Sequence, residues 1–333
     1  MTRNAANPGG ADKQRDGRAE TRAVIDIGSN SIKLRVIRRE ENALRVLIDR
    51  TELVRIGRGL SSGAIDEAAM RHGAEAVLRM VRTAEEMDAD PRVVGTMALR
   101  IARNAEDFIR EIRERTGIAV EVLSEEQEAY LAWLGAVHSL GMTGGRIAVL
   151  DIGGGSTQII VSADSRVVRS ESVSIGTVNL TEKFFASDPA EPGAAERAMQ
   201  YIRDAFSFDE VFMDVGAAAP RLSVIGLGGG VLALASVKQK LPSFIPGKLD
   251  GTVLTLDDIE VQRKIYAPMP LAARTKIEGL PPKRADIILA GACLTQCALE
   301  TLGADSLRVS INGLRHGLLL EMFGPSALPL PIS

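Results

Sequence analysis

The order of apolar and polar residues predicts strands at the start of the chain and helices after them. Three strand-like runs open the pattern, at residues 22–27, 31–38 and 44–54. The short polar turn between the last two favours an antiparallel meander. Residues 65–87 then place apolar side chains at helical spacing with charges on the other face, which predicts an amphipathic helix. A short strand at 92–95 follows it.

Helix and strand signals alternate through the next segment. We expect a helix with Asn104 as its N-cap and Gly117 as its stop. After a strand at 119–123, Ser124 and Gln127 fit a capping box, which predicts the start of another helix.

The second half of the chain repeats this order. After a glycine-rich loop at 141–145, strands are predicted at 146–151, 156–161, 167–174, 222–226 and 306–309. Helices are predicted at 178–185, 196–206, 257–266, 285–302 and 313–322. The repetition favours an α/β chain of duplicated architecture, with a ligand cleft between domains at 21–142 and 143–325. Residues 1–20 are expected to be a disordered tail and residues 326–333 a loose one.

One motif occurs in both halves. Residues 23–31 and 148–156 match in six of nine positions and lie 125 residues apart. Each is an apolar run that ends in one aspartate and a glycine turn, so backbone N–H groups can converge on a phosphate while the aspartate holds a divalent cation. The expected phosphate-binding residues are Asp26, Gly28, Ser29, Asn30, Ser31, Gly153, Gly154, Gly155, Ser156 and Thr157, with Gly228 and Gly229 of a third glycine turn.

Composition restricts the classes of partner. The formal charge is −3 over 333 residues, so nothing favours broad binding of nucleic acid or an anionic membrane surface. The polar N-terminus lacks the apolar core of a signal peptide, and the longest apolar stretch, 287–299, is shorter than the roughly 20 residues that span a bilayer. Cys293 and Cys297 fit a buried helix, which favours core residues in a reducing cytoplasm.

The chain resembles the exopolyphosphatase and guanosine pentaphosphate phosphohydrolase (Ppx/GppA) family. That family belongs to the superfamily shared by sugar kinases, actin and heat-shock chaperones. The most specific stretches are Gly-Thr-x-Ala-Leu-Arg-x-Ala-x-Asn and the helix that contains Gln-Glu-Ala. The resemblance is carried by Val24–Ser31, Arg55–Leu60, Gly95–Asn104, Ser124–Leu131, Asp151–Thr157, Arg284–Gly291 and Gly313–Leu319.

The resemblance implies a core-length member with two actin-like (ribonuclease H-like) domains. It implies that Glu128 is the base for an attacking water, that Asp151 and Glu128 bind Mg²⁺ or Mn²⁺, and that Arg100 contacts polyphosphate. A homodimer is also implied.

Several positions differ from the family pattern as the resemblance gives it. Gln158 stands where Glu is usual, and Gln can ligate a cation but supplies no charge. The others are Leu227 and Gly230 in the third glycine turn, Tyr130, Asn179, Ile311 and His316. These differences suggest an altered substrate or weaker catalysis.

The leading hypothesis is therefore a Mg²⁺-dependent exopolyphosphatase that releases the terminal phosphate. One alternative is a guanosine pentaphosphate 5′-phosphohydrolase. Another is a catalytically weak, regulatory member of the family that binds a phosphorylated ligand. The stretches around Arg100 and Glu128 argue against a kinase or a chaperone-like ATPase.

Overall fold

Two mixed β-sheets form the framework of the structure, a computed structural model that describes residues 20–57, 60–142, 144–206, 222–243, 245–324 and 327. The first sheet has the order β3-β2-β1-β4-β5. Its strands are β1 (Thr21–Ile27), β2 (Ser31–Arg39), β3 (Leu44–Leu53), β4 (Asp90–Gly95) and β5 (Val120–Val122). The expected tails lie outside the described residues, apart from Glu20 and Ala327.

The second sheet has the order β10-β11-β9-β6-β7-β8. Its strands are β6 (Arg146–Ile152), β7 (Thr157–Ala163), β8 (Arg166–Val173), β9 (Ser223–Leu227), β10 (Val253–Thr255) and β11 (Ser306–Val309). In both sheets an antiparallel meander continues into parallel strands, β4 and β5 in the first and β9 and β11 in the second. The α/β class and the duplicated architecture are therefore confirmed.

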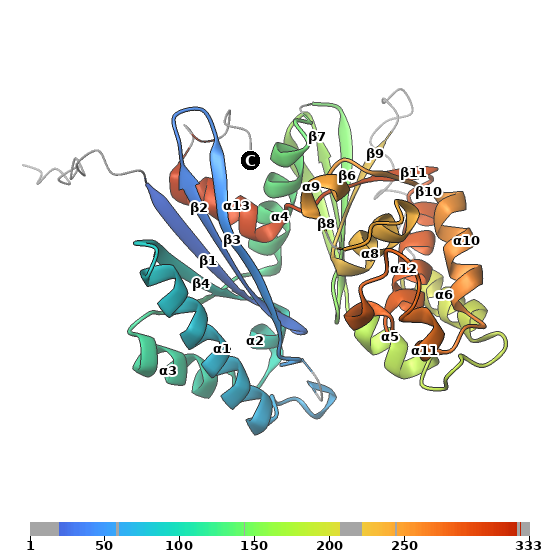
Figure 1. Ribbon diagram of the computed structural model, residues 1–333, viewed down its shortest axis with the longest axis horizontal. Coiled ribbons are helices and arrows are strands. Elements are labelled where there is room, and N and C mark those ends of the chain that lie inside the picture. Colours follow the sequence, from blue (N-terminus) through green and yellow to red (C-terminus); the bar gives the residue numbers. More distant parts are fainter. Residues whose placement is uncertain are drawn as a thin grey trace, which may run out of the picture.

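Helices cover the outer face of each sheet (Figure 1). On the first sheet these are α1 (Glu67–Glu85), α2 (Met97–Ile101) and α3 (Ala105–Thr116). On the second they are α5 (Thr177–Phe184), α6 (Ala194–Ala205), α8 (Gly229–Lys238), α9 (Pro246–Leu249), α10 (Leu256–Tyr266), α11 (Leu271–Arg274) and α12 (Ile288–Thr301). Single 3₁₀ turns lie at Leu60–Ser62 and Pro282–Arg284.

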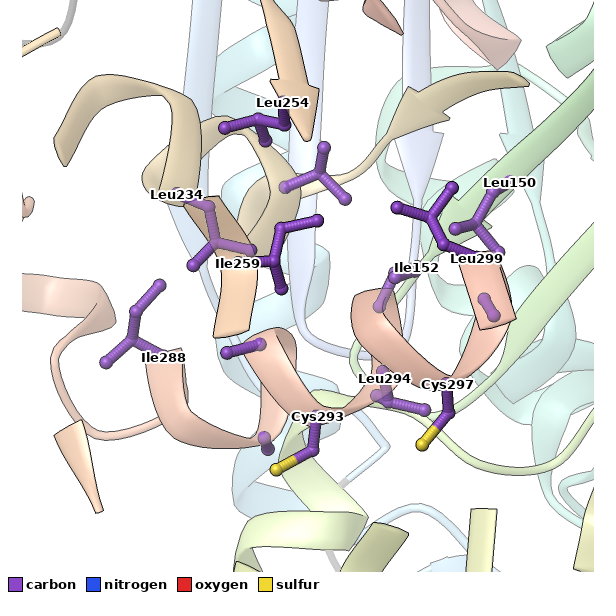
Figure 2. Close-up of a cluster of buried hydrophobic side chains, with 14 of the residues drawn as sticks. Leu150, Ile152, Leu234, Leu254, Ile259, Ile288, Cys293, Leu294, Cys297 and Leu299 are labelled. Carbon is purple, nitrogen blue, oxygen red and sulfur yellow. The ribbon is translucent and has the colours of Figure 1, made fainter. Parts of the chain in front are cut away.

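The largest hydrophobic core surrounds α12, which is apolar on all sides. Figure 2 shows Leu299 of α12 close to Leu150 and Ile152 of β6, with Leu234 of α8, Leu254 of β10 and Ile259 of α10 in the same cluster, while Cys293 and Cys297 point away from β6. Both cysteines are buried free thiols, as predicted. No helix within the described ranges combines the length and the apolar character needed to cross a membrane.

Two helices lie between the sheets, and each covers the sheet of the other half of the chain (Figure 1). α4 (Glu125–Ser139) packs Ala132 and Trp133 against β6, β7 and β9. α13 (Leu314–Phe323), at the end of the chain, packs Leu319 and Phe323 against the first sheet. The division at residues 142 and 143 stays a prediction, but these helices join the two halves.

The two inner helices also cross very closely. A Cβ atom on Gly135 would lie 2.2 Å from the carbonyl oxygen of Gly313, and one on Gly317 would lie 2.1 Å from the carbonyl oxygen of Leu131. Real Cβ atoms do not approach backbone oxygens so closely, so this crossing requires glycine on both helices.

Local capping agrees with the sequence in two places and differs in one. The Ser124–Gln127 capping box opens α4, and Gly117 ends α3 in the left-handed conformation. Asn104 flanks α3 but does not cap it, because its amide accepts from the N–H of Ile65 at 2.8 Å and donates to the Ile65 carbonyl at 2.9 Å. The side chain that was expected to cap a helix instead fixes the segment that leads into α1.

Candidate functional site

A cavity of about 1080 Å³ is lined from both sheets. The first Asp-Gly turn contributes Asp26 and Gly28–Ser31, and the second contributes Asp151 and Gly153–Ser156. Gly228 and Gly229 of the third turn and Glu128 of α4 also line it. Residues as far apart in the sequence as Asp26 and Arg315 are thereby brought to one cavity.

The two hairpin turns have the same internal bond. The N–H of Gly28 donates to the carbonyl of Ser31 at 3.1 Å, and that of Gly153 donates to the carbonyl of Ser156 at 2.9 Å. The turns also approach each other, since a Cβ on Gly154 would lie 3.0 Å from the Cβ of Asn30. A ligand phosphate between them can therefore meet backbone donors from both halves.

The third glycine turn opens α8, a helix that the sequence pattern did not predict. Gly228 has φ +96°, and a Cβ there would lie 2.1 Å from the carbonyl oxygen of Ile152. α8 begins at the next residue, so the positive end of its dipole faces the cavity beside the second hairpin. The guanidinium of Arg284 lies directly against Gly229.

The two aspartates have different surroundings. Asp26 is opposite Lys33 in the β1–β2 register, and its Oδ2 lies 3.7 Å from Lys33 Nζ. Asp151 is opposite Gln158 in the β6–β7 register, and no described basic side chain lies within ion-pair distance of it. Burial raises the pKa of Asp151, Lys33 lowers it, and the charge of Asp26 raises it further.

Glu128 lies on the first turns of α4 and is held by Arg100 of α2. Arg100 Nη1 donates to Glu128 Oε2 at 2.7 Å and to the Leu123 carbonyl at 2.9 Å. Both side chains of the pair are only 16% exposed. Burial raises the pKa of Glu128 to about 7, against the opposing effect of Arg100, and the carboxylates of Asp151 and Asp26 add to the rise.

Two of the residues singled out in the sequence do not line the cavity. Arg100 does not line the cavity but lies behind its wall, where it donates to the lining residue Glu128. Thr157 is fully buried, and its hydroxyl donates to the carbonyl of Ile175 at 2.7 Å. Thr157 therefore ties the start of β7 to the segment that follows β8.

The carboxylates fit a cation that needs few protein ligands. Among the described residues, no three His, Cys, Asp or Glu side chains gather closely enough to hold a metal ion alone. Mg²⁺ commonly takes one or two carboxylates and completes its shell with waters and phosphate oxygens. Asp151, which has no ion pair within the described part of the chain, is the side chain best placed for that role, with Glu128 also on the cavity wall.

Basic side chains on the cavity wall were not recognised from the sequence. They are Lys33, Arg35, Arg55, Lys283, Arg284 and Arg315. Asp49 pairs with Arg35 and Arg315, and Asp286 lies 3.7 Å from Arg55. Arg284 has no ion-pair partner in the described part of the chain and can receive an anion. Its only sequence signal was its place in a stretch that resembles the family.

Comparison with known proteins identifies the family. The model of the Ppx/GppA phosphatase family matches residues 35–325. The chain belongs to the Ppx/GppA phosphatase family. Membership of a phosphatase family agrees with the expectation of a hydrolase, and the fold agrees with the crystal structure of the Aquifex aeolicus family member. That structure is 29% identical with a TM-score of 0.78, and the match covers 92% of this chain and 98% of that one.

Curated relatives carry different names within the family. Exopolyphosphatase 1 of Mycobacterium tuberculosis is 27% identical over 323 residues, which cover 91% of this chain and 88% of the relative. Guanosine-5'-triphosphate,3'-diphosphate pyrophosphatase of Photobacterium profundum is 26% identical over 303 residues, which cover 90% of this chain. The chain spans 46% and 59% of the length of two of the curated relatives it matches.

Only some of the positions that depart from the Ppx/GppA pattern line the cavity. Gln158, Leu227 and Ile311 do. Tyr130 is 44% exposed beside Trp133, and Gly230 and His316 are buried outside the cavity wall. Asn179 Nδ2 donates to the Gly155 carbonyl at 2.9 Å, and its Oδ1 accepts from the N–H of Gly176 at 2.7 Å. Asn179 therefore braces the second hairpin.

Proposed function

We propose that this protein hydrolyses the terminal phosphoanhydride of inorganic polyphosphate with Mg²⁺ or Mn²⁺, using Glu128 as the base. The observation that carries the proposal is the partly buried Glu128, held by Arg100 beside the two Asp-Gly turns. A carboxyl with a pKa of about 7 is half ionised at neutral pH and can accept a proton from water.

The phosphate chain would be bound by backbone N–H groups and hydroxyls of the two hairpins. Ser29, Ser31 and Ser156 supply hydroxyls, and the start of α8 adds a helix N-terminus. Arg284 adds a guanidinium that forms no ion pair among the described residues, although the charge of Asp286 acts on it. A cavity of about 1080 Å³ has room for several phosphate units.

The chemistry suits these groups. Phosphoryl transfer depends on charge neutralisation and on an in-line nucleophile more than on covalent catalysis. A divalent cation bound at Asp151 would neutralise charge on the terminal phosphate. Glu128 takes the proton of the attacking water, and this kind of help contributes about 10²–10⁴-fold. Arg100 is a positioning residue that orients the Glu128 carboxylate.

A guanosine pentaphosphate substrate requires the same bond cleavage, and the relatives' names divide between the two activities. The cavity of about 1080 Å³ and Arg284, which has no ion-pair partner among the described residues, are compatible with either anion. A binding protein with weak turnover would use the same hairpins, and Gln158 beside Asp151 is the observation that favours it.

Phosphate release should be measured side by side on long-chain polyphosphate, guanosine pentaphosphate and ATP, with Mg²⁺ or Mn²⁺. We expect release from polyphosphate that falls by about 10²-fold or more in Glu128→Gln. Glu126→Gln is the matched control, because Glu126 lies on the same helix turn with its side chain exposed.

Each other outcome separates the hypotheses. Unchanged release in Glu128→Gln would remove Glu128 as the base. Faster phosphate release from guanosine pentaphosphate than from polyphosphate would make guanosine pentaphosphate the substrate. Tight binding of either anion without phosphate release would establish the regulatory alternative.

A further inference from the structure

The two copies of the Asp-Gly hairpin differ in the residue opposite the aspartate. In the first, Asp26 faces Lys33, and in the second, Asp151 faces Gln158. All four residues line the cavity. Directly opposed residues in an antiparallel pair place their Cβ atoms about 4.5–5.5 Å apart on the same face of the sheet. The second hairpin therefore presents a carboxylate and an amide together.

The side-chain oxygen Oε1 of Gln158 has no hydrogen-bond partner in the described part of the chain. The residue is only 5% exposed, and its Oε1 is out of contact with solvent. A buried acceptor without a partner costs stability unless a ligand satisfies it. Rotation about the last side-chain bond exchanges the amide nitrogen and oxygen, so the oxygen can turn toward a cation at Asp151.

Charge compensation distinguishes Asp151 from the carboxylates around it. Lys33 lies 3.7 Å from Asp26, and Arg100 lies 2.7 Å from Glu128. Asp151 is left as the carboxylate of these three without an ion pair among the described residues. The amide opposite it offers an oxygen but no charge, so the protein provides little negative charge to hold a dication by itself.

We propose that Gln158 is a neutral ligand for the divalent cation, directly or through one water, and that this cation binds tightly only together with a phosphate chain. The inference rests on the proposed function for the identity of the ligand. Phosphate oxygens supply the negative charge that an amide does not. The cation and the phosphate chain therefore bind the protein cooperatively. By linkage, each raises the affinity of the other by the same factor.

The experiment measures binding without turnover. Bound Mn²⁺ is followed by electron paramagnetic resonance, with and without a methylene-bridged triphosphate that cannot be hydrolysed at its bridges. The affinity for that analogue is measured with and without Mn²⁺ by calorimetry, after correction for the Mn²⁺ that it chelates in solution. We expect about tenfold or greater mutual enhancement in the wild-type protein.

Two substitutions at Gln158 should act in opposite directions, so a folding defect cannot produce both results. Gln158→Ala should weaken Mn²⁺ binding in the presence of the analogue by about tenfold or more. Gln158→Glu should tighten Mn²⁺ binding in its absence by about tenfold and remove most of the enhancement. Gln200→Glu, on the exposed face of α6, adds the same charge elsewhere and should change neither value.

The inference is overturned if Gln158→Ala binds Mn²⁺ and the analogue as the wild-type protein does, or if wild-type Mn²⁺ affinity is the same with and without the analogue. Failure of the proposed function is a separate result. Cooperative binding without any phosphate release from polyphosphate would refute the enzyme and leave the role of Gln158 standing.

Discussion

Removal of the Arg100 side chain should move the acid limb of the activity profile to higher pH. Burial raises the pKa of Glu128 to about 7, and Arg100 opposes this rise through its hydrogen bond and its charge. An adjacent opposite charge lowers a carboxyl pKa by about 1–3 units, so Arg100→Ala should raise it by a similar amount. At pH 7 the ionised fraction of Glu128, and with it kcat/KM, should fall by roughly 5- to 500-fold.

The assay is kcat/KM for polyphosphate from pH 5 to pH 10. Wild-type activity should rise with pH through an apparent pKa of about 7, because the base acts when it is ionised. Arg100→Ala should recover activity at high pH, and Arg100→Lys should keep most of the wild-type profile. Arg103→Ala is the matched control, since Arg103 is exposed and donates to the Ser62 carbonyl instead.

A uniform loss of activity at every pH in Arg100→Ala, with the acid limb unmoved, would refute this reasoning. Arg100 would then act on the substrate itself, as the resemblance to the family first implied, and the ion pair with Glu128 would not set the ionisation of the base.

Two further predictions concern stability. Gly135→Ala should lower the free energy of unfolding by about 1–3 kcal/mol and the melting temperature by several degrees, because the new methyl group would lie 2.2 Å from the carbonyl oxygen of Gly313. Gly247→Ala is the control: its methyl group would meet nothing within 4 Å, so the melting temperature should stay nearly unchanged. Burial beside Arg35 lowers the pKa of His316 well below 6.5, so below that pH the unfolded chain binds a proton that the folded one does not. As the pH is lowered through that range, the free energy of unfolding should therefore fall by up to about 1.4 kcal/mol per pH unit. Urea titrations at pH 7 and pH 5 should show a smaller fall in His316→Gln than in the wild-type protein. An equal fall in both proteins would count against a neutral, buried His316.

The sequence predicted those helices and strands whose structure depends on neighbouring residues alone. The meander strands alternate or run apolar, and the Ser124–Gln127 box and Gly117 act on their own neighbours, so each was recognisable without the fold. The repeated Asp-Gly motif predicted that two turns would meet, because a duplicated sequence implies a duplicated sheet.

Contacts between distant segments explain what the sequence did not reveal. α8 is a local exception: it begins at Gly229, directly after β9 and the turn residue Gly228, and a run of glycines is typical of a turn rather than of a helix start. Asn104 satisfies all the local rules for a cap, yet Ile65, 39 residues earlier, takes its amide. Arg284 reaches the cavity only because Gly229 leaves space for its guanidinium. The pairing of Arg100 with Glu128 likewise depends on how α2 and α4 approach each other.

The exchanged positions of α4 and α13 have a consequence for how the chain folds. If the chain were divided near residue 143, the first part would keep α4 without the second sheet that its Trp133 packs on. The second part would keep α13, with Leu319 and Phe323 deprived of the first sheet. Each fragment would expose an apolar surface that is buried in the intact chain, and both would tend to aggregate or to reassociate. We therefore expect the two halves, which share one plan, to fold as a single cooperative unit, so that their separate expression would not yield two working modules.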